Sequence, residues 1–163
     1  AIVHNNTIVD FVPQADARGV NLLLEQPGLG AVTVDDPKAG AVTVNMTRCK
    51  VKLEPVWGED GSVSGVQADI KAHVYLKEVE HPEALEEERV LKAVSEQLEQ
   101  WVENVLQKMS DTEVDFLGIG MQLRMRHPIK WDRAPRSWEE VLGELEFDAQ
   151  AECIVARAGE LQR

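Results

Sequence analysis

Cysteine is scarce in this sequence, with only Cys49 and Cys153 among 163 residues. Neither belongs to a CxxC pair or has a histidine at the spacing of a structural zinc site, so no such site is expected. Each falls on an apolar position of an alternating segment, which favours a buried thiol over a reactive one. A disulfide stays possible if the two segments form adjacent strands.

Long apolar runs and basic residues are also in short supply. No apolar stretch approaches the roughly 20 residues needed to cross a bilayer. The chain has 17 Lys and Arg against 29 Asp and Glu, so its formal net charge is −12. An acidic surface repels phosphate groups, so we expect neither nucleic-acid binding nor direct electrostatic docking onto an anionic membrane.

What the sequence does contain is the composition of a folded domain. Hydrophobic residues make up 44% and charged residues 28%, a balance that argues against a disordered chain. A chain of 163 residues fits one hydrophobic core comfortably. We therefore expect a single domain over residues 1–163.

Residue combinations that carry catalysis are missing. The four histidines are scattered, and no G-x-S-x-G nucleophile motif occurs. Gly118 and Gly120 lack the third glycine and the preceding parallel strand of a dinucleotide-binding loop. The glutamates at 86–88 fit the solvated start of a helix. We predict no catalytic residue, no cofactor and no metal site.

Alternating apolar residues predict the strands. Two short strands flank a turn at Asn5-Asn6, and longer ones cover 40–57, 66–77 and 145–155. Within 40–57 the apolar positions change parity after Met46, which predicts an irregularity near Thr47 or Arg48.

Charge also makes a prediction about strand order. The outward residues of 40–57 include three cations, whereas those of 145–155 include three carboxylates. Opposite charges facing each other across strands contribute roughly 0.2–1 kcal/mol per pair. We therefore expect these two strands to be neighbours. The residues concerned are Arg48, Lys50 and Lys52 on the first strand, and Glu146, Asp148 and Glu152 on the second.

Helical periodicity completes the prediction. A short helix is expected over 13–25, and a long amphipathic one opens at His81-Pro82 and runs to about Ser110. The segment 113–125 fits helix and strand equally, 128–135 reads as a loop, and Ser137 starts a short helix. The result is an α+β fold, with a mostly antiparallel sheet packed against one long helix and shorter ones.

Over nearly its whole length the chain resembles the C-terminal domain of the C subunit of spore germinant receptors, the GerAC-type lipoproteins. The resemblance lies in the order and spacing of short motifs, and the Glu-rich helix falls between the early and late ones as it does in that family. The motifs are Ile8-Val9, Ala17-Arg18-Gly19, Asp115-x-x-Gly118-x-Gly120, His127-Pro128, Trp131, Ser137-Trp138-Glu139-Glu140 and Gly159.

The resemblance implies a non-catalytic receptor subunit that helps to trigger germination. Its partners would be a polytopic A-type and an integral-membrane B-type subunit. A lipidated cysteine upstream of Ala1 would anchor it to the outer face of the spore inner membrane, because Cys49 and Cys153 lie within strand patterns. The chain would form the C-terminal domain of that longer lipoprotein.

One segment, 115–138, is the candidate site for contacting partners or anchoring a loop. It is interrupted by glycine and proline and is basic within an acidic chain. The candidate residues are Asp115, Gly118, Gly120, Arg124, Arg126, Pro128, Trp131 and Trp138. An alternative function is small-ligand binding between helix and sheet, which requires a cavity of about 300 Å³ or more.

Overall fold

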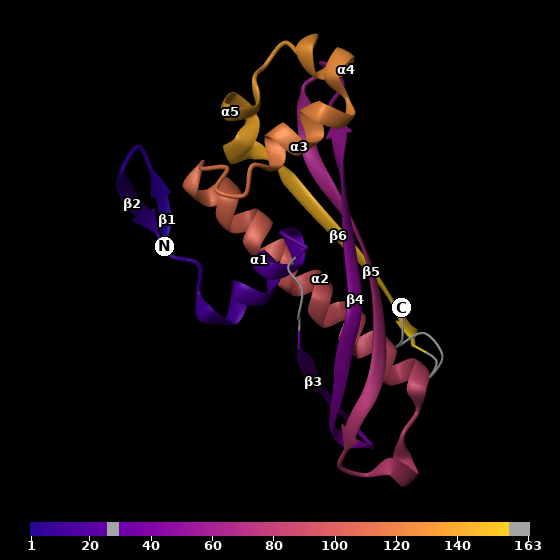
Figure 1. Cartoon of the computed structure of the whole chain (residues 1–163). Coiled ribbons are helices and arrows are strands. Elements are labelled where there is room, and N and C mark those ends of the chain that lie inside the picture. Colours follow the sequence, from indigo (N-terminus) through magenta and orange to yellow (C-terminus); the bar gives the residue numbers. More distant parts are fainter. Residues whose placement is uncertain (26–29, 157–163) are drawn as a thin grey trace.

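The molecule is built on a four-stranded sheet with one long helix across it (Figure 1). The computed structural model describes residues 1–25 and 30–156. The sheet has the order β3 (Ala31–Asp36), β4 (Gly40–Trp57), β5 (Val63–Val79), β6 (Glu146–Val155). The pairs β3–β4 and β4–β5 are antiparallel, whereas β5–β6 is parallel. The expected α+β class with a mostly antiparallel sheet is confirmed.

Helices and a separate hairpin surround this sheet. The hairpin pairs β1 (Ile2–His4) with β2 (Thr7–Asp10). The helices are α1 (Ala17–Leu23), α2 (Glu87–Thr112), α3 (Ile119–Arg126), α4 (Pro128–Asp132) and α5 (Trp138–Val141). Single 3-10 turns precede α1 (η1, Gln14–Asp16) and α2 (η2, Pro82–Ala84) and follow α5 (η3, Leu142–Glu144).

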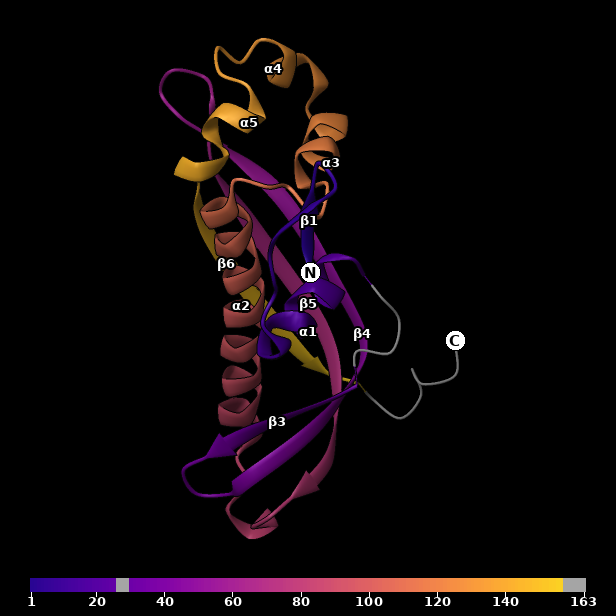
Figure 2. The same cartoon turned by 90° about the vertical axis from the view of Figure 1, so that its left-hand side faces the viewer.

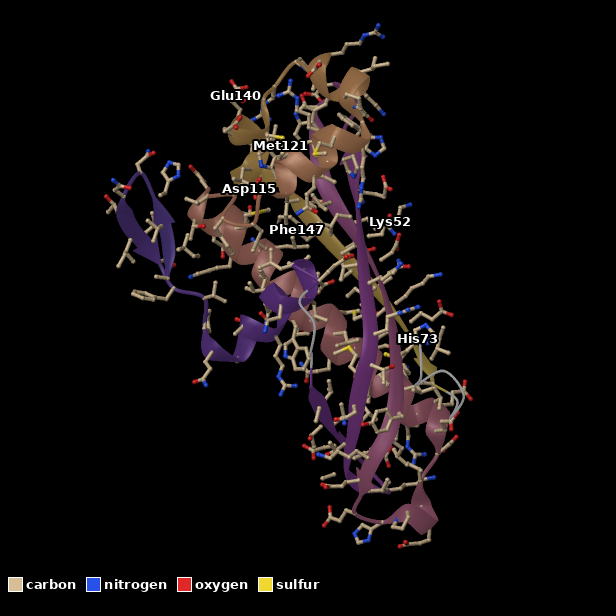
Figure 3. The ribbon with its side chains drawn as sticks, in the orientation of Figure 1. Lys52, His73, Asp115, Met121, Glu140 and Phe147 are labelled. Atoms are coloured by element: carbon tan, nitrogen blue, oxygen red, sulfur yellow. The ribbon has the colours of Figure 1, made fainter. Side chains whose placement is uncertain are left out.

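The core lies between α2 and one face of the sheet. The apolar stripe of α2 is buried against the strands, and the helix runs along the sheet beside β6 (Figure 2). On the opposite face, Lys52 and His73 point away from α2 (Figure 3). The sheet therefore has one covered and one polar face, as antiparallel sheets commonly do. The buried stripe consists of Val90, Val94, Leu98, Val102, Val105, Leu106 and Met109.

Carboxylates of α2 also cover the outer edge of β6. The backbone N–H of Ala149 donates to Glu103 Oε1 at 3.1 Å, and that of Ala151 donates to Glu99 Oε1 at 2.8 Å. An uncovered edge offers unpaired N–H groups to other chains. Two glutamates one helical turn apart thus close part of this edge.

Several local predictions are confirmed. Asn5 and Asn6 both have positive φ, 49° and 61°, and turn the first hairpin. The register between β4 and β5 shifts between Met46 and Arg48, where the apolar parity changes. Ser137 caps α5, and the reciprocal hydrogen bonds with Glu140 form a capping box.

The predicted strand neighbours are wrong. β5 lies between β4 and β6, so the cations of β4 do not face the carboxylates of β6. β6 pairs in parallel with β5 instead, and Lys71 lies 3.8 Å from Glu152 across that pair.

Other boundaries differ from the prediction. β3 was not predicted, α2 begins at Glu87 after a 3-10 turn, and the expected loop at 128–135 contains α4. The ambiguous segment 113–125 is helical from Ile119 onward.

The strand order also settles the cysteine pairing. Cys49 and Cys153 both lie opposite Ala72, one on each side of β5. Two strand spacings amount to about 9–10 Å, beyond the roughly 7 Å limit between the Cα atoms of a disulfide. Both thiols are free, and burial raises the pKa of Cys49 to about 12. Both cysteines are half-buried rather than fully buried as expected.

Helix α1 packs so closely on α2 that one glycine has no room for a side chain. A Cβ on Gly19 would lie 2.1 Å from the carbonyl oxygen of Trp101. We predict that Gly19→Ala lowers the free energy of unfolding by about 1–3 kcal/mol, since backbone must move to relieve the overlap. Urea denaturation measures the change. Gly143→Ala is the control, because the added atom meets only the movable end of Glu113; equal effects would contradict the prediction.

A buried ion pair ties the β3–β4 turn to the start of α2. Arg89 donates to the carboxylate of Asp36, which also accepts the N–H groups of Lys38 and Ala39. The Arg89 guanidinium, followed by the Ala39 N–H, lowers the pKa of Asp36.

A lowered pKa stabilises the folded state above the unfolded value, about 3.9, and this contribution is lost as the pH falls below it. We predict that Asp36→Asn lowers the urea midpoint at pH 7 and that the difference from the unaltered chain narrows at pH 3. Midpoints measured across this range test the prediction. A difference in urea midpoint that does not change with pH would show that the charge on Asp36 does not contribute to stability.

Candidate functional site

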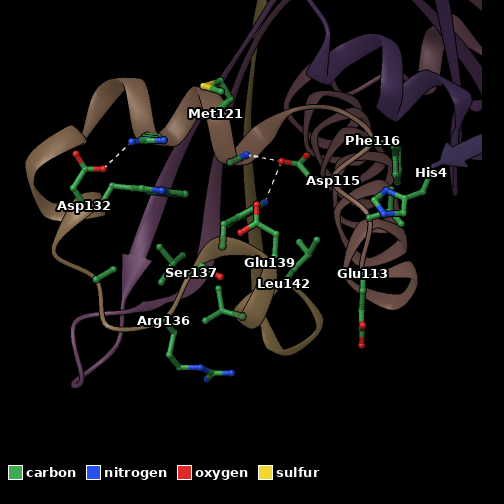
Figure 4. Close-up of a pocket in the computed structure, with 18 of the residues that line it drawn as sticks. His4, Glu113, Asp115, Phe116, Met121, Asp132, Arg136, Ser137, Glu139 and Leu142 are labelled. Carbon is green, nitrogen blue, oxygen red and sulfur yellow. Dashed lines mark hydrogen bonds and ion pairs between the residues drawn. The ribbon is translucent and has the colours of Figure 1, made fainter. Parts of the chain in front are cut away.

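The segment that follows α2 folds over one end of the sheet, and we call residues 115–144 the tip. Asp115 holds its first helix in place. Its Oδ1 accepts the backbone N–H of Ile119 at 2.8 Å, and its Oδ2 accepts that of Gly120 at 2.7 Å. Oδ2 also accepts the indole N–H of Trp138 at 3.1 Å (Figure 4). One carboxylate therefore caps α3 and connects it to α5.

The two glycines after Asp115 have separate steric reasons. Gly118 has φ of 68°, a left-handed conformation that costs glycine little. A Cβ on Gly120 would lie 2.6 Å from Cδ1 and Nε1 of the Trp138 ring. The Asp-x-x-Gly-x-Gly motif is thus a helix cap, a turn and a contact surface for one indole.

Trp138 belongs to a row of three tryptophans inside the tip. Its side chain is buried, and the ring centroid of Trp131 lies 5.6 Å away. Trp131 in turn meets Trp57, from the end of β4, edge to face at 6.3 Å. Aromatic pairs at these distances add stability beyond their buried area. The row joins α5, α4 and the sheet.

The remaining candidate residues lie nearer the surface. Arg124 pairs with Asp132 at 3.0 Å, and Arg126 donates to the carbonyl oxygen of Leu53 at 2.8 Å. Pro128 is the first residue of α4, where its missing N–H costs nothing. The structure thus brings all eight candidates into the tip, but Arg124 and Arg126 lie on its exposed side.

Sequence reasoning missed the contacts that β4 makes with the tip. His127 Nε2 lies 2.8 Å from Glu54 Oε2, and its ring meets Trp57 edge to face. The hydrogen bond from Lys52, with a smaller contribution from His127, lowers the pKa of Glu54. A polar pair this far apart in the chain leaves no periodic signal, so only the fold reveals it.

A half-open hollow of about 650 Å³ lies between the first hairpin, the end of α2 and the tip (Figure 4). Two of its polar groups have internal partners: the Asp115 carboxylate has three donors, and Arg136 pairs with Glu144 at 2.8 Å. A second hollow, between the start of α2 and the sheet, measures about 50 Å³. This volume is far below the roughly 300 Å³ required by the ligand hypothesis. Within residues 1–25 and 30–156, no cluster of three potential metal ligands occurs.

Comparisons with known proteins identify the class. The C-terminal model of spore germination B3/GerAC-like proteins matches residues 1–159. The chain therefore belongs to this family of spore germination proteins, the C subunits of germinant receptors, as the sequence motifs predicted. None of the helices in the described ranges is long and apolar enough to span a membrane.

Two particular relatives give the extent of the likeness. Spore germination protein KC of Bacillus subtilis (strain 168) is 27% identical over 124 residues, which cover 73% of this chain and 30% of that protein. The crystal structure of the GerBC protein has the same fold, with a TM-score of 0.73 at 19% identity, and the match covers 93% of this chain and 48% of GerBC. The chain thus spans less than half the length of either relative.

Removing the capping carboxylate should loosen the tip. We predict that Asp115→Ala lowers the free energy of unfolding by about 2 kcal/mol, because two helix N–H groups and one indole N–H lose their acceptor. Trp138→Phe should cost less when Asp115 is already alanine, and a double-mutant cycle measures this coupling. Asp111→Ala is the matched control, since Asp111 accepts only from the exposed Gln107 side chain. Additive effects of the Asp115 and Trp138 substitutions on the free energy of unfolding would contradict the connection of α3 to α5 through Asp115.

Proposed function

We propose that this chain is a non-catalytic domain of a nutrient germinant receptor and that it works by contact with other receptor subunits. Membership of the germinant-receptor C-subunit family supports this role. The partners are the polytopic A-type and B-type subunits. The domain forms the C-terminal part of a longer lipoprotein, held by an upstream lipid anchor at the outer face of the spore inner membrane.

The observation that carries the proposal is the exposed hairpin of β1 and β2. Four large apolar side chains of this hairpin and its exit are 46–61% exposed, namely Val3, Ile8, Val9 and Phe11. The hairpin stands out from the body at the C-terminal end of α2 (Figure 1). An apolar group of this kind, on an element that contributes little to the core, is typical of a protein contact.

The hairpin is nevertheless held firmly. Ile2 is buried, and Asp10 pairs with Lys108 of α2. Because an isolated two-stranded hairpin is only marginally stable in water, these attachments fix the direction in which the paired residues Val3 and Ile8 point.

Gly118 and Pro128 are exposed and shape the backbone at a turn and at the start of α4. We assign the anchoring role to four of the candidate residues: Asp115, Gly120, Trp131 and Trp138. Their contacts are directed inward, toward α3, α5 and the end of β4. Asp115 in particular is engaged by three donors, which leaves it poorly placed to act as an acid or base. This arrangement favours a supporting role over chemistry.

The hairpin makes the proposal testable in the full-length protein. We predict that Ile8→Ser combined with Phe11→Ser reduces co-purification of the A-type and B-type subunits from detergent-solubilised spore membranes at least about tenfold, because apolar contact area is lost. Val56→Ser combined with Ile154→Ser is the matched control, since both residues are exposed elsewhere.

Thermal unfolding separates assembly from folding in the same variants. The hairpin pair should leave the unfolding temperature unchanged, because both side chains are exposed. Full co-purification despite the two substitutions would overturn the contact role of the hairpin. A lowered unfolding temperature with intact assembly would show that the hairpin packs inside the subunit instead.

A further inference from the structure

The outer surface of α3 and α4 carries a row of exposed apolar side chains. Met121, Met125 and Ile129 are 63%, 76% and 70% exposed, higher fractions than those of the other large apolar residues in the described ranges. Met121 and Met125 lie one turn apart on α3, and Ile129 follows on α4; we call these three residues the apolar ridge. The opposite side of α3, with Ile119 and Leu123, is fully buried. The ridge therefore projects from a side of the tip that the core does not use.

Cations flank the apolar ridge. Residues 119–133 contain four basic side chains and one acidic one, in a chain whose net charge is −12. Arg126 donates to a backbone carbonyl, Lys130 lies 4.5 Å from the ring centroid of Trp57, and Arg133 is exposed. Among residues 1–25 and 30–156, no carboxylate forms an ion pair with these three cations, so their charges face solvent, whereas Arg124 pairs with Asp132.

The fold separates this basic surface from the acidic one. Residues 78–103 carry nine acidic and two basic side chains. They begin at the end of the elongated molecule that is opposite to α3 and α4 (Figure 1). An anionic surface would thus attract the α3–α4 segment, 119–133, and repel the start of α2.

We propose that the apolar ridge and its flanking cations dock the tip onto the surface of an anionic lipid bilayer. Met121, Met125 and Ile129 enter the headgroup region, while Arg126, Lys130 and Arg133 bind lipid phosphates. Apolar side chains that project beside Lys and Arg can combine burial in the headgroup region with electrostatic attraction to anionic lipids. The net charge of the chain argued against membrane docking, but 28 of its 29 acidic residues lie outside 119–133, where four of the 17 basic residues lie. This inference does not depend on the hairpin contact.

Flotation of the chain with lipid vesicles tests the docking. We expect binding to vesicles of phosphatidylglycerol and phosphatidylcholine in equal amounts, little binding to phosphatidylcholine alone, and weaker binding as salt is raised. Each cation near an anionic surface contributes about fivefold to affinity, so Arg126→Gln with Arg133→Gln should weaken binding about 25-fold.

The apolar part needs its own variant. Met121→Ser, Met125→Ser and Ile129→Ser together should weaken binding at least about tenfold without lowering the unfolding temperature, since the three side chains are exposed. Lys50→Gln with Lys71→Gln is the matched control, because it removes two cations from the outer face of the sheet. The variant with both lysines replaced should bind vesicles like the unaltered chain.

Three results would overturn the proposal. One is no binding to anionic vesicles at low salt, and another is binding that the control pair weakens as much as the tip pair. The third is a ridge variant that loses a receptor subunit on co-purification while vesicle binding stays unchanged, which would make the ridge a protein contact. The hairpin variants leave vesicle binding unaffected, so failure of one proposal is distinguishable from failure of the other.

Discussion

The structure depends on a mismatch in length between α2 and the strands it covers. β5 has 17 residues and spans about 56 Å, whereas the 26 residues of α2 span about 39 Å. A helix that returns the chain along β5 therefore leaves one end of the β4–β5 hairpin without cover. The tip fills that end: Arg126 reaches Leu53, His127 reaches Glu54, and Arg136 N–H donates to Ser62 Oγ.

The same return path sets the position of β6. A chain that leaves β5, comes back along α2 and then enters a strand beside β5 has to run parallel to β5. Cross-strand charge pairs contribute too little to compete with this connection, and for that reason the neighbours inferred from charge were wrong. The glutamates of α2 then have a second function, because Glu99 and Glu103 reach the outer edge of β6.

Local signals in the sequence predicted the parts of the fold that depend on neighbouring residues. Ser137 with Glu140, Asn5 with Asn6, and the parity change after Met46 each involve residues within a few positions of one another. β3 was not predicted because Val32 and Val34 are its only large apolar residues. Such a short alternation forms a strand because it pairs with β4, and this pairing cannot be read from the sequence.

The candidate site was located by motif but its physical basis was not predictable. The sequence shows Asp115, Gly118 and Gly120 as a short motif, whereas the indole that Asp115 and Gly120 contact belongs to Trp138. Trp57 and Glu54 lie more than 70 residues before Trp131 and His127, which they contact, and carry no pattern of their own. Periodicity identifies elements, whereas the contacts between their ends depend on where each element stops.

The internal contacts of the tip determine which of its side chains are exposed. Cap, tryptophan row and contacts with β4 fix α3 and α4 from the inside, so their outer side chains project in a constant direction. Were these helices loosely held, the exposed methionines would fold back onto the tryptophans, since apolar side chains gain free energy by burial. The internal anchoring therefore keeps the apolar ridge exposed, and a property of the core determines what the surface can bind.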